Sequence, residues 1–341
     1  MNARPVERTV LVTGGAGFIG SAVCRLLVAD GSTRVVNLDK LTYAASPTAL
    51  VGVAAAPNYR FVQGDIDDRP LVASLLAEER IDAVMHLAAE SHVDRSLADA
   101  GQFIATNITG TYHLLEAVLD HWRGLDGVGQ ERFRFLHVST DEVFGDLPYD
   151  SGSFDEDSPY RPSSPYAASK AAADHLVRAW ARSYDLPVLL TNCSNNYGPF
   201  QHPEKLIPLT ITRALRGEPV PVYGDGENVR DWMHVEDHAR ALDLVLRQGE
   251  PGRTYAIGAR EEQRNIAVVT MICDLLDARV PRPGMRRRDL IRFVADRRGH
   301  DRRYAIDPAR IEAELEWRPA RSFEEGLAAT VGWYVAQEGA A

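Results

Sequence analysis

Two adjacent carboxylates, Asp141 and Glu142, follow an apolar segment at residues 133–138 that is typical of a buried strand. In a parallel α/β sheet, ligands bind at the carboxyl ends of the strands. Two neighbouring carboxylates can divide acid and base work, because one ionised group raises the pKa of the other. Adjacent strand residues point to opposite faces, however. We therefore expect Asp141 and Glu142 to lie beyond the strand, in a turn or short helix, with Thr140 beside them.

Tyr166 and Lys170 open a predicted helix and are spaced four residues apart, so they share one helical face. A nearby ammonium favours the phenolate, and would lower the pKa of Tyr166 from its usual value of about 10. Such a phenol could remove the proton of an alcohol while a hydride leaves the same carbon. The spacing alone is common on helices, and it indicates a redox site only beside a dinucleotide-binding motif.

The GxxGxxG motif at residues 14–20 is such a dinucleotide-binding motif, because it follows a predicted strand and opens a predicted helix. The glycines allow a tight turn, and the helix N-terminus offers N–H groups to a pyrophosphate. Asp39 follows at the end of the next predicted strand, where a carboxylate accepts hydrogen bonds from the adenosine ribose and repels a 2′-phosphate. The sequence therefore predicts NAD as the cofactor, with residues 65–66 near the adenine.

The elements that must position these residues alternate along the first two thirds of the chain. The predicted strands are residues 9–13, 34–38, 59–63, 83–87, 133–138, 188–192 and 254–257. The predicted helices are residues 18–29, 70–79, 102–122 and 166–184. This order predicts an α/β, Rossmann-type doubly wound parallel sheet.

Beyond residue 194 the alternation is lost. We expect a loop at 195–207, a helix at 207–216, a short strand at 220–223, and mixed helix and loop at 260–341. These segments predict a smaller α/β lobe for substrate. The expected division gives residues 1–194 and about 233–259 to the NAD-binding domain, and residues 195–232 and 260–341 to the substrate lobe.

The composition argues against several classes of protein, namely nucleic-acid-binding, membrane-spanning and metal-dependent proteins. The chain has 341 residues, of which 45% are hydrophobic, so it can form a large core without a metal or disulfide. A net charge of -10 argues against nucleic acid as a partner. The three cysteines are widely spaced and predict buried thiols in a reducing cytoplasm. No apolar run reaches the roughly 18 residues of a membrane span. The histidines lack metal-ligand spacing, and we expect His86 and His137 to be core residues.

The three motifs together resemble the extended short-chain dehydrogenase/reductase superfamily. Within it, residues 139–143 (STDEV) resemble the dTDP-glucose 4,6-dehydratases, since related epimerases have small or neutral residues where Asp141 and Glu142 stand. The resemblance extends over nearly the whole chain, including residues 39–44, 87–96, 164–170, 195–199, 203–208 and 297–304. The chain departs from the family pattern at Phe144, where tyrosine is usual, and at Arg298, where proline is usual.

The resemblance implies a lyase that converts dTDP-glucose to dTDP-4-keto-6-deoxyglucose and water, in rhamnose-type deoxysugar biosynthesis. It implies oxidation at C4, elimination across C5 and C6, and hydride return to C6. The implied catalytic residues are Thr140, Asp141, Glu142, Tyr166 and Lys170. With the glycine motif, the implied NAD site comprises Gly14, Gly17, Phe18, Ile19, Gly20, Asp39, Lys40, Leu41, Thr42, Asp65, Ile66, Leu87, Ala88, Ala89, Glu90, Thr106, Tyr166, Lys170 and Asn196. The implied substrate site comprises Ser91, Thr140, Asn195, Lys205, Leu206, Pro221, Val222, Tyr223, Arg230, Asn265, Asp296, Arg297, Arg298, Gly299 and His300.

Three alternatives remain open at this point: a UDP-sugar 4,6-dehydratase, an NAD-dependent nucleotide-sugar 4-epimerase, and a non-enzymatic NAD sensor or scaffold that kept the fold. The resemblance also implies a homodimer, in which residues 108–122 and 166–184 pair with their copies in a four-helix bundle. Both segments are apolar on more than one face, and such helices need a second partner besides the sheet. The residues in question are Leu114, Leu115, Val118, Leu176, Val177 and Trp180.

Overall fold

The computed structural model describes residues 6–338, and its centre is a seven-stranded parallel sheet in the order β10-β6-β5-β4-β1-β2-β3. The strands are β1 (Arg8–Thr13), β2 (Thr33–Asp39), β3 (Tyr59–Gln63), β4 (Ala83–His86), β5 (Arg134–Thr140), β6 (Val188–Cys193) and β10 (Thr254–Ile257). The strand order reverses direction between β1 and β4, which is where a doubly wound sheet binds its ligands. The predicted fold class is confirmed.

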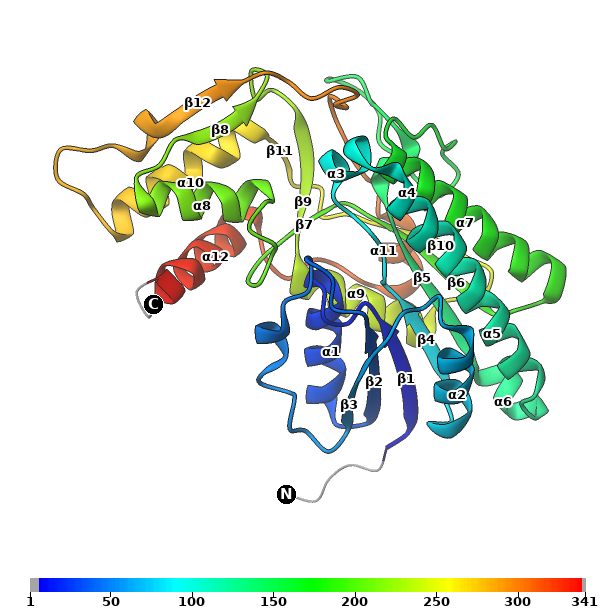
Figure 1. Ribbon diagram of the computed structural model, residues 1–341. Helices are drawn as coiled ribbons and strands as arrows, with labels where there is room; N and C mark the ends of the chain where they lie inside the picture. Colours follow the sequence, from blue (N-terminus) through cyan, green and yellow to red (C-terminus); the bar gives the residue numbers. More distant parts are fainter. Residues whose placement is uncertain (1–5, 339–341) are drawn as a thin grey trace.

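Helices cover both faces of this sheet (Figure 1). One face carries α1 (Phe18–Asp30) and α9 (Val235–Gln248), and the other carries α2 (Arg69–Glu78), α5 (Thr111–Arg123) and α7 (Pro165–Tyr184). Because both faces are covered, the inner strands are buried along nearly their whole length, whereas the edge strand β3 is largely exposed.

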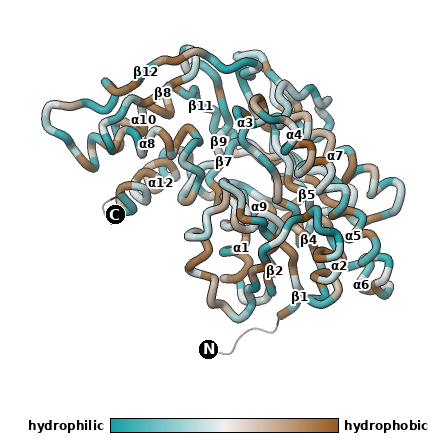
Figure 2. Tube along the Cα trace, in the orientation of Figure 1, coloured by the Kyte–Doolittle hydropathy of each residue, from teal (hydrophilic) through white to brown (hydrophobic). Residues whose placement is uncertain are grey.

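Strand β1 has apolar side chains on both faces of the sheet. Val10 and Val12 pack with α1 and α9, whereas Leu11, between them, packs with α2, α5 and α7. This follows from the two-residue repeat of a strand. Hydrophobic residues accordingly gather along the inner strands and the inward sides of the helices (Figure 2). His86 and His137 are buried on β4 and β5, as predicted.

The single helix predicted at 102–122 is wrong, because the structure divides this segment. A short helix, α4 (Ala100–Phe103), leads into a π-helical turn, Ile104–Gly110, before α5 begins. Within the π-helical turn, the Asn107 side chain accepts a hydrogen bond from the Glu90 N–H and donates to the Glu90 carbonyl. A π-helical turn contains one residue more than an α-helical turn. The extra residue displaces the following apolar positions only slightly, so the hydrophobic pattern of the sequence does not reveal it. Helix α3 (Val93–Ala98) precedes this segment.

A smaller lobe holds two further sheets. One has the order β11-β9-β7, from β7 (Asn195–Tyr197), β9 (Val229–His234) and β11 (Glu262–Arg264). The other pairs β8 (Val220–Tyr223) with β12 (Ile291–Val294). The core of the lobe lies among α8 (Leu206–Arg216), α10 (Asn265–Arg279) and α12 (Phe323–Glu338). The prediction of a loop at 195–207 is wrong for residues 195–197, which form β7. The prediction of only helix and loop beyond residue 260 is wrong for β11 and β12. Strands of three or four residues are too short to show a repeat.

Helix α11 (Ala309–Leu315) returns to the large sheet, where Ile311, Leu315 and Trp317 join the core beside Tyr255. We propose the two-lobe division expected from the sequence, with residues 309–317 joined to the large lobe. The remaining helices are α6 (Gly127–Arg132) and the 3-10 turns Pro47–Leu50, Asp141–Phe144 and Arg287–Leu290. Within residues 6–338, no helix has the length and apolar character that crossing a membrane requires.

Candidate active site

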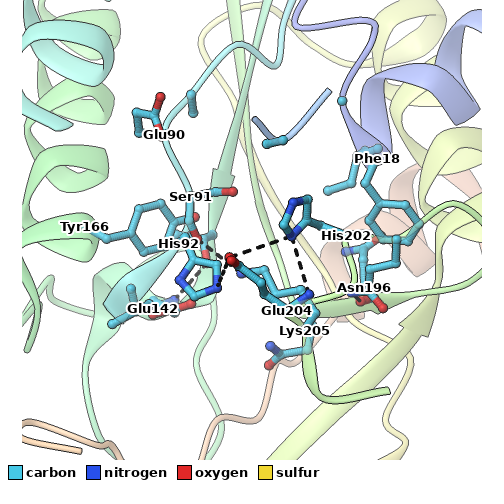
Figure 3. Close-up of a pocket in the computed structure, with 18 of the residues that line it drawn as sticks. Phe18, Glu90, Ser91, His92, Glu142, Tyr166, Asn196, His202, Glu204 and Lys205 are labelled. Carbon is cyan, nitrogen blue, oxygen red and sulfur yellow. Dashed lines mark hydrogen bonds and ion pairs between the residues drawn. The ribbon is translucent and has the colours of Figure 1, made fainter. Parts of the chain in front are cut away.

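A cavity of about 460 Å³ opens at the carboxyl ends of the large sheet, between the two lobes. All five predicted catalytic residues line it. It is also lined by every predicted cofactor residue except Leu41, and by every predicted substrate residue except Asp296, Arg298 and Gly299. Figure 3 shows Tyr166 and Phe18 on opposite sides of this cavity, with Glu204 and Lys205 between them and Glu142 beneath Tyr166.

The two carboxylates reach the cavity together because β5 ends at Thr140 and a 3-10 turn, Asp141–Phe144, follows at once. The turn replaces the alternation of a strand, as the sequence analysis expected. The Thr140 hydroxyl accepts a hydrogen bond from the Glu142 N–H at 3.3 Å and donates to Asp141 Oδ1 at 3.2 Å. Gly145 closes the turn at φ 89°, where a Cβ would lie 2.3 Å from the Arg161 carbonyl oxygen.

The surroundings of the two carboxyl groups affect their pKa values differently. Burial, and secondly the charge of Glu142, raise the pKa of Asp141 well above its ordinary value. Its Oδ2 is buried and has no hydrogen-bond partner, which suits a protonated oxygen directed at a ligand. Burial also raises the pKa of Glu142, but Lys205, Arg297 and Arg230 favour its ionised form. Asp141 is therefore suited to act as an acid and Glu142 as a base.

Tyr166 and Lys170 share a face of α7, whose first turn is capped by the Ser164 side chain. The expectation that Lys170 lowers the pKa of Tyr166 is wrong in this structure. Burial, and then the charge of Glu142, raise the pKa of Tyr166 well above its ordinary value, and a side-chain hydrogen bond with Thr140 only partly opposes them. The Lys170 ammonium donates to the Val138 carbonyl at 2.9 Å, so its charge is not committed to the phenol.

The glycine turn fits a dinucleotide. Gly14 has φ 73°, and a Cβ there would lie 2.6 Å from the Ala88 N–H nitrogen; a Cβ on Gly20 would lie 2.1 Å from the Gly14 carbonyl oxygen. Asp39 stands at the end of β2, and its carboxylate accepts from the N–H groups of Ala16 at 2.9 Å and Leu41 at 2.8 Å. Leu41 therefore acts through its backbone, at φ 59°, and not as a cavity wall. This carboxylate at the edge of the cavity favours NAD over NADP.

Replacing Gly20 by alanine should disturb both the turn and the fold, because the new methyl group has no room. We expect the free energy of unfolding to fall by about 1–3 kcal/mol and NAD to bind at least about tenfold more weakly, as one lost contact of 1.4 kcal/mol would require. Urea unfolding and calorimetric titration measure the two effects. Gly127→Ala is the matched control, since its Cβ meets nothing within 4 Å; equal effects of the two variants would contradict the steric argument.

The opposite end of the cavity is basic. Arg230 is 5% exposed, donates to the Asp301 carbonyl at 2.9 Å, and lies 4.3 Å from the centre of the Tyr304 ring. Lys205 donates to the Ser91 carbonyl at 3.2 Å, and Arg297 lies 3.8 Å from Asp94. Three cations on separate elements suit a diphosphate, which arginine can bind in a bidentate manner.

The structure does not bring the whole predicted segment 296–300 to the cavity wall. Asp296 instead accepts a hydrogen bond from the His300 ring at 2.7 Å, Gly299 turns the chain at φ 66°, and Arg298 is exposed. Among the lining residues that the sequence analysis missed are Asp94, His202, Glu204, Trp232 and Tyr304. Asp94, Glu204 and Tyr304 lie within segments that resemble the family, and His202 directly precedes one of them, so these positions were the available signal.

The family model described as GDP-mannose 4,6 dehydratase matches residues 11–330. A dTDP-glucose 4,6-dehydratase from Neisseria meningitidis is 56% identical over 331 residues, covering 96% of this chain and 93% of that protein. One from Escherichia coli is 54% identical over 334 residues, covering 96% and 92%.

Solved structures agree in fold. DesIV, a dTDP-glucose 4,6-dehydratase from Streptomyces venezuelae crystallised with NAD and TYD bound, has a TM-score of 0.88 and 49% identity, covering 97% of this chain and 98% of that one. A UDP-glucose 4-epimerase from Thermotoga maritima has a TM-score of 0.84 and 28% identity, covering 97% and 99%. The fold is therefore shared with enzymes of another reaction type, so the residues of the site, and not the fold, distinguish the reaction.

Proposed function

Since the chain belongs to the dTDP-glucose 4,6-dehydratase family, we propose that it is an NAD-dependent lyase that converts dTDP-glucose to dTDP-4-keto-6-deoxyglucose and water. One observation carries the proposal beyond the shared fold. Asp141 and Glu142 both follow the end of β5 and line the same cavity as Tyr166, with different protonation tendencies. A 4-epimerase needs the tyrosine but has no use for a carboxylic acid beside a carboxylate.

In the proposed reaction, NAD bound to the glycine turn supplies reversible redox chemistry at C4 and C6 of the sugar. Tyr166 accepts the proton of the C4 hydroxyl, and Thr140 donates a hydrogen bond to the C4 oxygen. The resulting ketone acidifies the proton on C5, which Glu142 removes. Asp141 gives its proton to the C6 hydroxyl, which leaves as water. The elimination leaves Glu142 protonated and Asp141 ionised. The hydride taken from C4 would then return to C6 while Glu142 gives its proton back to C5, and Asp141 regains a proton from water, which completes the 4-keto-6-deoxy product.

The residues proposed to hold the cofactor lie on the large lobe, from Gly14 at the start of α1 to Asp39 at the end of β2. Those proposed to hold the sugar nucleotide lie mainly on the small lobe. Lys205, Arg230 and Arg297 supply positive charge for the diphosphate, and β8 contributes residues beside the base. We therefore propose that the hexose binds at the carboxyl end of β5, between the two lobes.

Incubation with two substrates tests the proposal. With dTDP-glucose we expect a product lighter by one water, detected by mass spectrometry, and with UDP-glucose a much slower reaction. A UDP-sugar dehydratase would reverse that preference. A 4-epimerase would give a product of unchanged mass, and a scaffold protein would give none; each of these three results contradicts the proposal.

We also propose a homodimer formed through α5 and α7. The six residues that suggested this from the sequence all pack into the core beneath these helices, so they do not need a second partner. Other aromatic residues on the same helices support the proposal. Tyr112 is 38% exposed and Tyr184 is 40% exposed, and both rings contact Trp180, at 5.9 and 5.5 Å.

Replacing Tyr112 by glutamate should dissociate this dimer, because a charge would be buried between two aromatic clusters. Light scattering coupled to size exclusion measures the mass directly. Phe293→Glu is the matched control, since Phe293 is 59% exposed on β12, far from these helices in Figure 1. We expect a monomer for the first variant and a dimer for the second. A monomeric unmodified protein would contradict the proposal.

We propose a cytoplasmic location for the enzyme. The cysteine side chains Cys24, Cys193 and Cys273 are free thiols in buried positions. Burial raises the pKa of all three thiols, which keeps them protonated and unreactive. Such cysteines suit a reducing compartment.

A further inference from the structure

A carboxylate on α7, Asp174, lies behind the candidate catalytic residues and has no part in the reaction proposed above. Its side chain is fully buried. Oδ1 accepts a hydrogen bond from His137 Nε2 at 3.0 Å, and Oδ2 accepts from Ser139 Oγ and Tyr160 OH, both at 2.8 Å. A longer bond of 3.4 Å comes from Asn192 Nδ2. So many donors on one buried carboxyl group are typical of an ionised carboxylate.

The sheet itself presents these donors. His137 and Ser139 are two residues apart on β5, so they point to the same face. Asn192 is the register partner of Ser139 on β6. Helix α7 packs over this face and directs Asp174 at all three side chains. The cluster therefore follows from the register of two central strands.

The charges in this cluster are an anion and a cation. Burial opposes ionisation of Asp174, but the hydrogen bonds from His137 and Ser139 and the charges nearby lower its pKa. Burial and the charge of Lys170 lower the pKa of His137 to about 4, so its ring is neutral at pH 7. A neutral imidazole that bonds to a carboxylate through Nε2 carries its proton there. His137 therefore lies beside both charges without adding a third, and its Nε2, which donates to Asp174, does not accept a hydrogen bond from the Lys170 ammonium.

Lys170 is the cation, and it lies one helical turn before Asp174. Its ammonium is 3.5 Å from His137 Nε2, the atom that Asp174 holds, and it donates to the Val138 carbonyl on the same strand. Burial lowers the pKa of Lys170, and the charge of Asp174 is the first influence opposing that effect. Of the other cations that line the cavity, Lys40 follows β2 of the large sheet, whereas Lys205, Arg230 and Arg297 stand on the small lobe.

We propose that Asp174 is a positioning residue, which keeps Lys170 in its charged form and fixes the His137 ring against which the ammonium lies. The inference rests on the proposed function, in which Tyr166, on the same face of α7 as Lys170, takes the C4 proton. Without the buried negative charge, the Lys170 amine loses its proton at a lower pH. The wall of the cavity beside Tyr166 then loses a cation, and we expect oxidation at C4 to slow.

Other titratable or charged groups surround the pair on several elements. They are His86 on β4, His137 on β5, Tyr160 in the loop before α7, Tyr166 and Arg178 on α7, and Cys193 on β6. Burial lowers the pKa of the histidines and raises the pKa of Tyr160 and Cys193, so these groups add no charge at pH 7. Arg178 donates to the Tyr160 hydroxyl.

Chemical labelling of Lys170 tests the proposal without turnover. The lysines of the chain are Lys40, Lys170 and Lys205, so peptide mass spectrometry after acetylation at graded pH follows each amine separately. In the unmodified protein Lys170 should be unreactive at pH 7. In Asp174→Asn, the midpoint of its labelling should fall by about one pH unit or more, since removing one buried opposite charge has at least that effect.

Tyr160→Phe is the matched control, because it removes one donor from the cluster and leaves the carboxylate. Its labelling midpoint should stay within about 0.3 unit of the unmodified protein. Equal shifts in both variants would show that the cluster acts only as scaffolding, and no shift in Asp174→Asn would overturn the proposal. If Asp174→Asn does not fold, the unmodified protein decides: a Lys170 amine that reacts readily at pH 7 contradicts the proposal.

Kinetics supply the second measurement. With dTDP-glucose, kcat of Asp174→Asn should fall about tenfold, the equivalent of 1.4 kcal/mol in the barrier, and the basic limb of the pH profile should move to lower pH. KM should change less than about twofold, because Asp174 does not line the cavity. A larger rise in KM with unchanged kcat would contradict the assigned role. If the unmodified enzyme lacks turnover, the proposed function fails, while labelling still decides the role of Asp174.

Discussion

Replacing Asp141 by asparagine should lower the rate of water loss from dTDP-glucose by about 100- to 10,000-fold, the usual contribution of a positioned general acid. The amide has nearly the shape of the protonated carboxyl group but cannot give its proton to the C6 hydroxyl. Oxidation at C4 does not require that proton. Reduced cofactor should therefore accumulate during a single turnover, and rapid-mixing absorbance measures it against product formation by mass spectrometry.

Asp150→Asn is the matched control for this experiment, because Asp150 is an exposed aspartate on the loop that follows the catalytic turn. Its rates should remain within about twofold of the unmodified enzyme, as surface substitutions usually do. Product formation by Asp141→Asn at the unmodified rate would contradict the acid assignment. A block of oxidation as severe as that of elimination would instead place Asp141 in the first step.

Replacing Tyr166 by phenylalanine should stop the reaction one step earlier. The phenyl ring keeps the packing against Phe103, whose ring centre lies 6.3 Å away, but it cannot accept the C4 proton. We expect kcat to fall by about 100- to 10,000-fold, with no reduced cofactor during a single turnover. Rapid-mixing absorbance again measures this result, which is opposite to that for Asp141→Asn.

The control for this variant is Tyr149→Phe, on the loop after the catalytic turn, where the side chain is 52% exposed. It should retain full activity. Reduced cofactor appearing at the unmodified rate in Tyr166→Phe would show that another group accepts the proton. Calorimetric titration of both variants should give the same NAD affinity, because the dinucleotide is held mainly by the glycine turn and Asp39.

The sequence was most informative where chemistry depends on local order. The position of Asp141 and Glu142 after β5 could be predicted because an apolar strand ends in polar residues, and both side chains can serve one ligand only beyond that end. The glycine turn and Asp39 were predictable for the same reason, since each occupies a strand end whose neighbours are fixed by the doubly wound order. Chain-wide resemblance added the basic end of the cavity.

What the sequence could not give depends on contacts between distant segments. The spacing of Tyr166 and Lys170 predicts a shared face but not that the ammonium donates to the Val138 carbonyl, or that Glu142 lies near enough to raise the pKa of the phenol. The cluster around Asp174 requires the register of β5 against β6. Strands β7, β11 and β12 have three or four residues each, and their pairing depends on the small lobe that surrounds them.

The central claim is that one sugar carbon is oxidised only so that water can leave from the next, after which the same hydrogen returns to the substrate. Incubation with dTDP-glucose carrying deuterium at C4 measures this directly. NMR of the product should show the deuterium at C6 of a 4-keto-6-deoxy sugar. Deuterium found at C4 of a sugar of unchanged mass, or lost to solvent, would contradict the account.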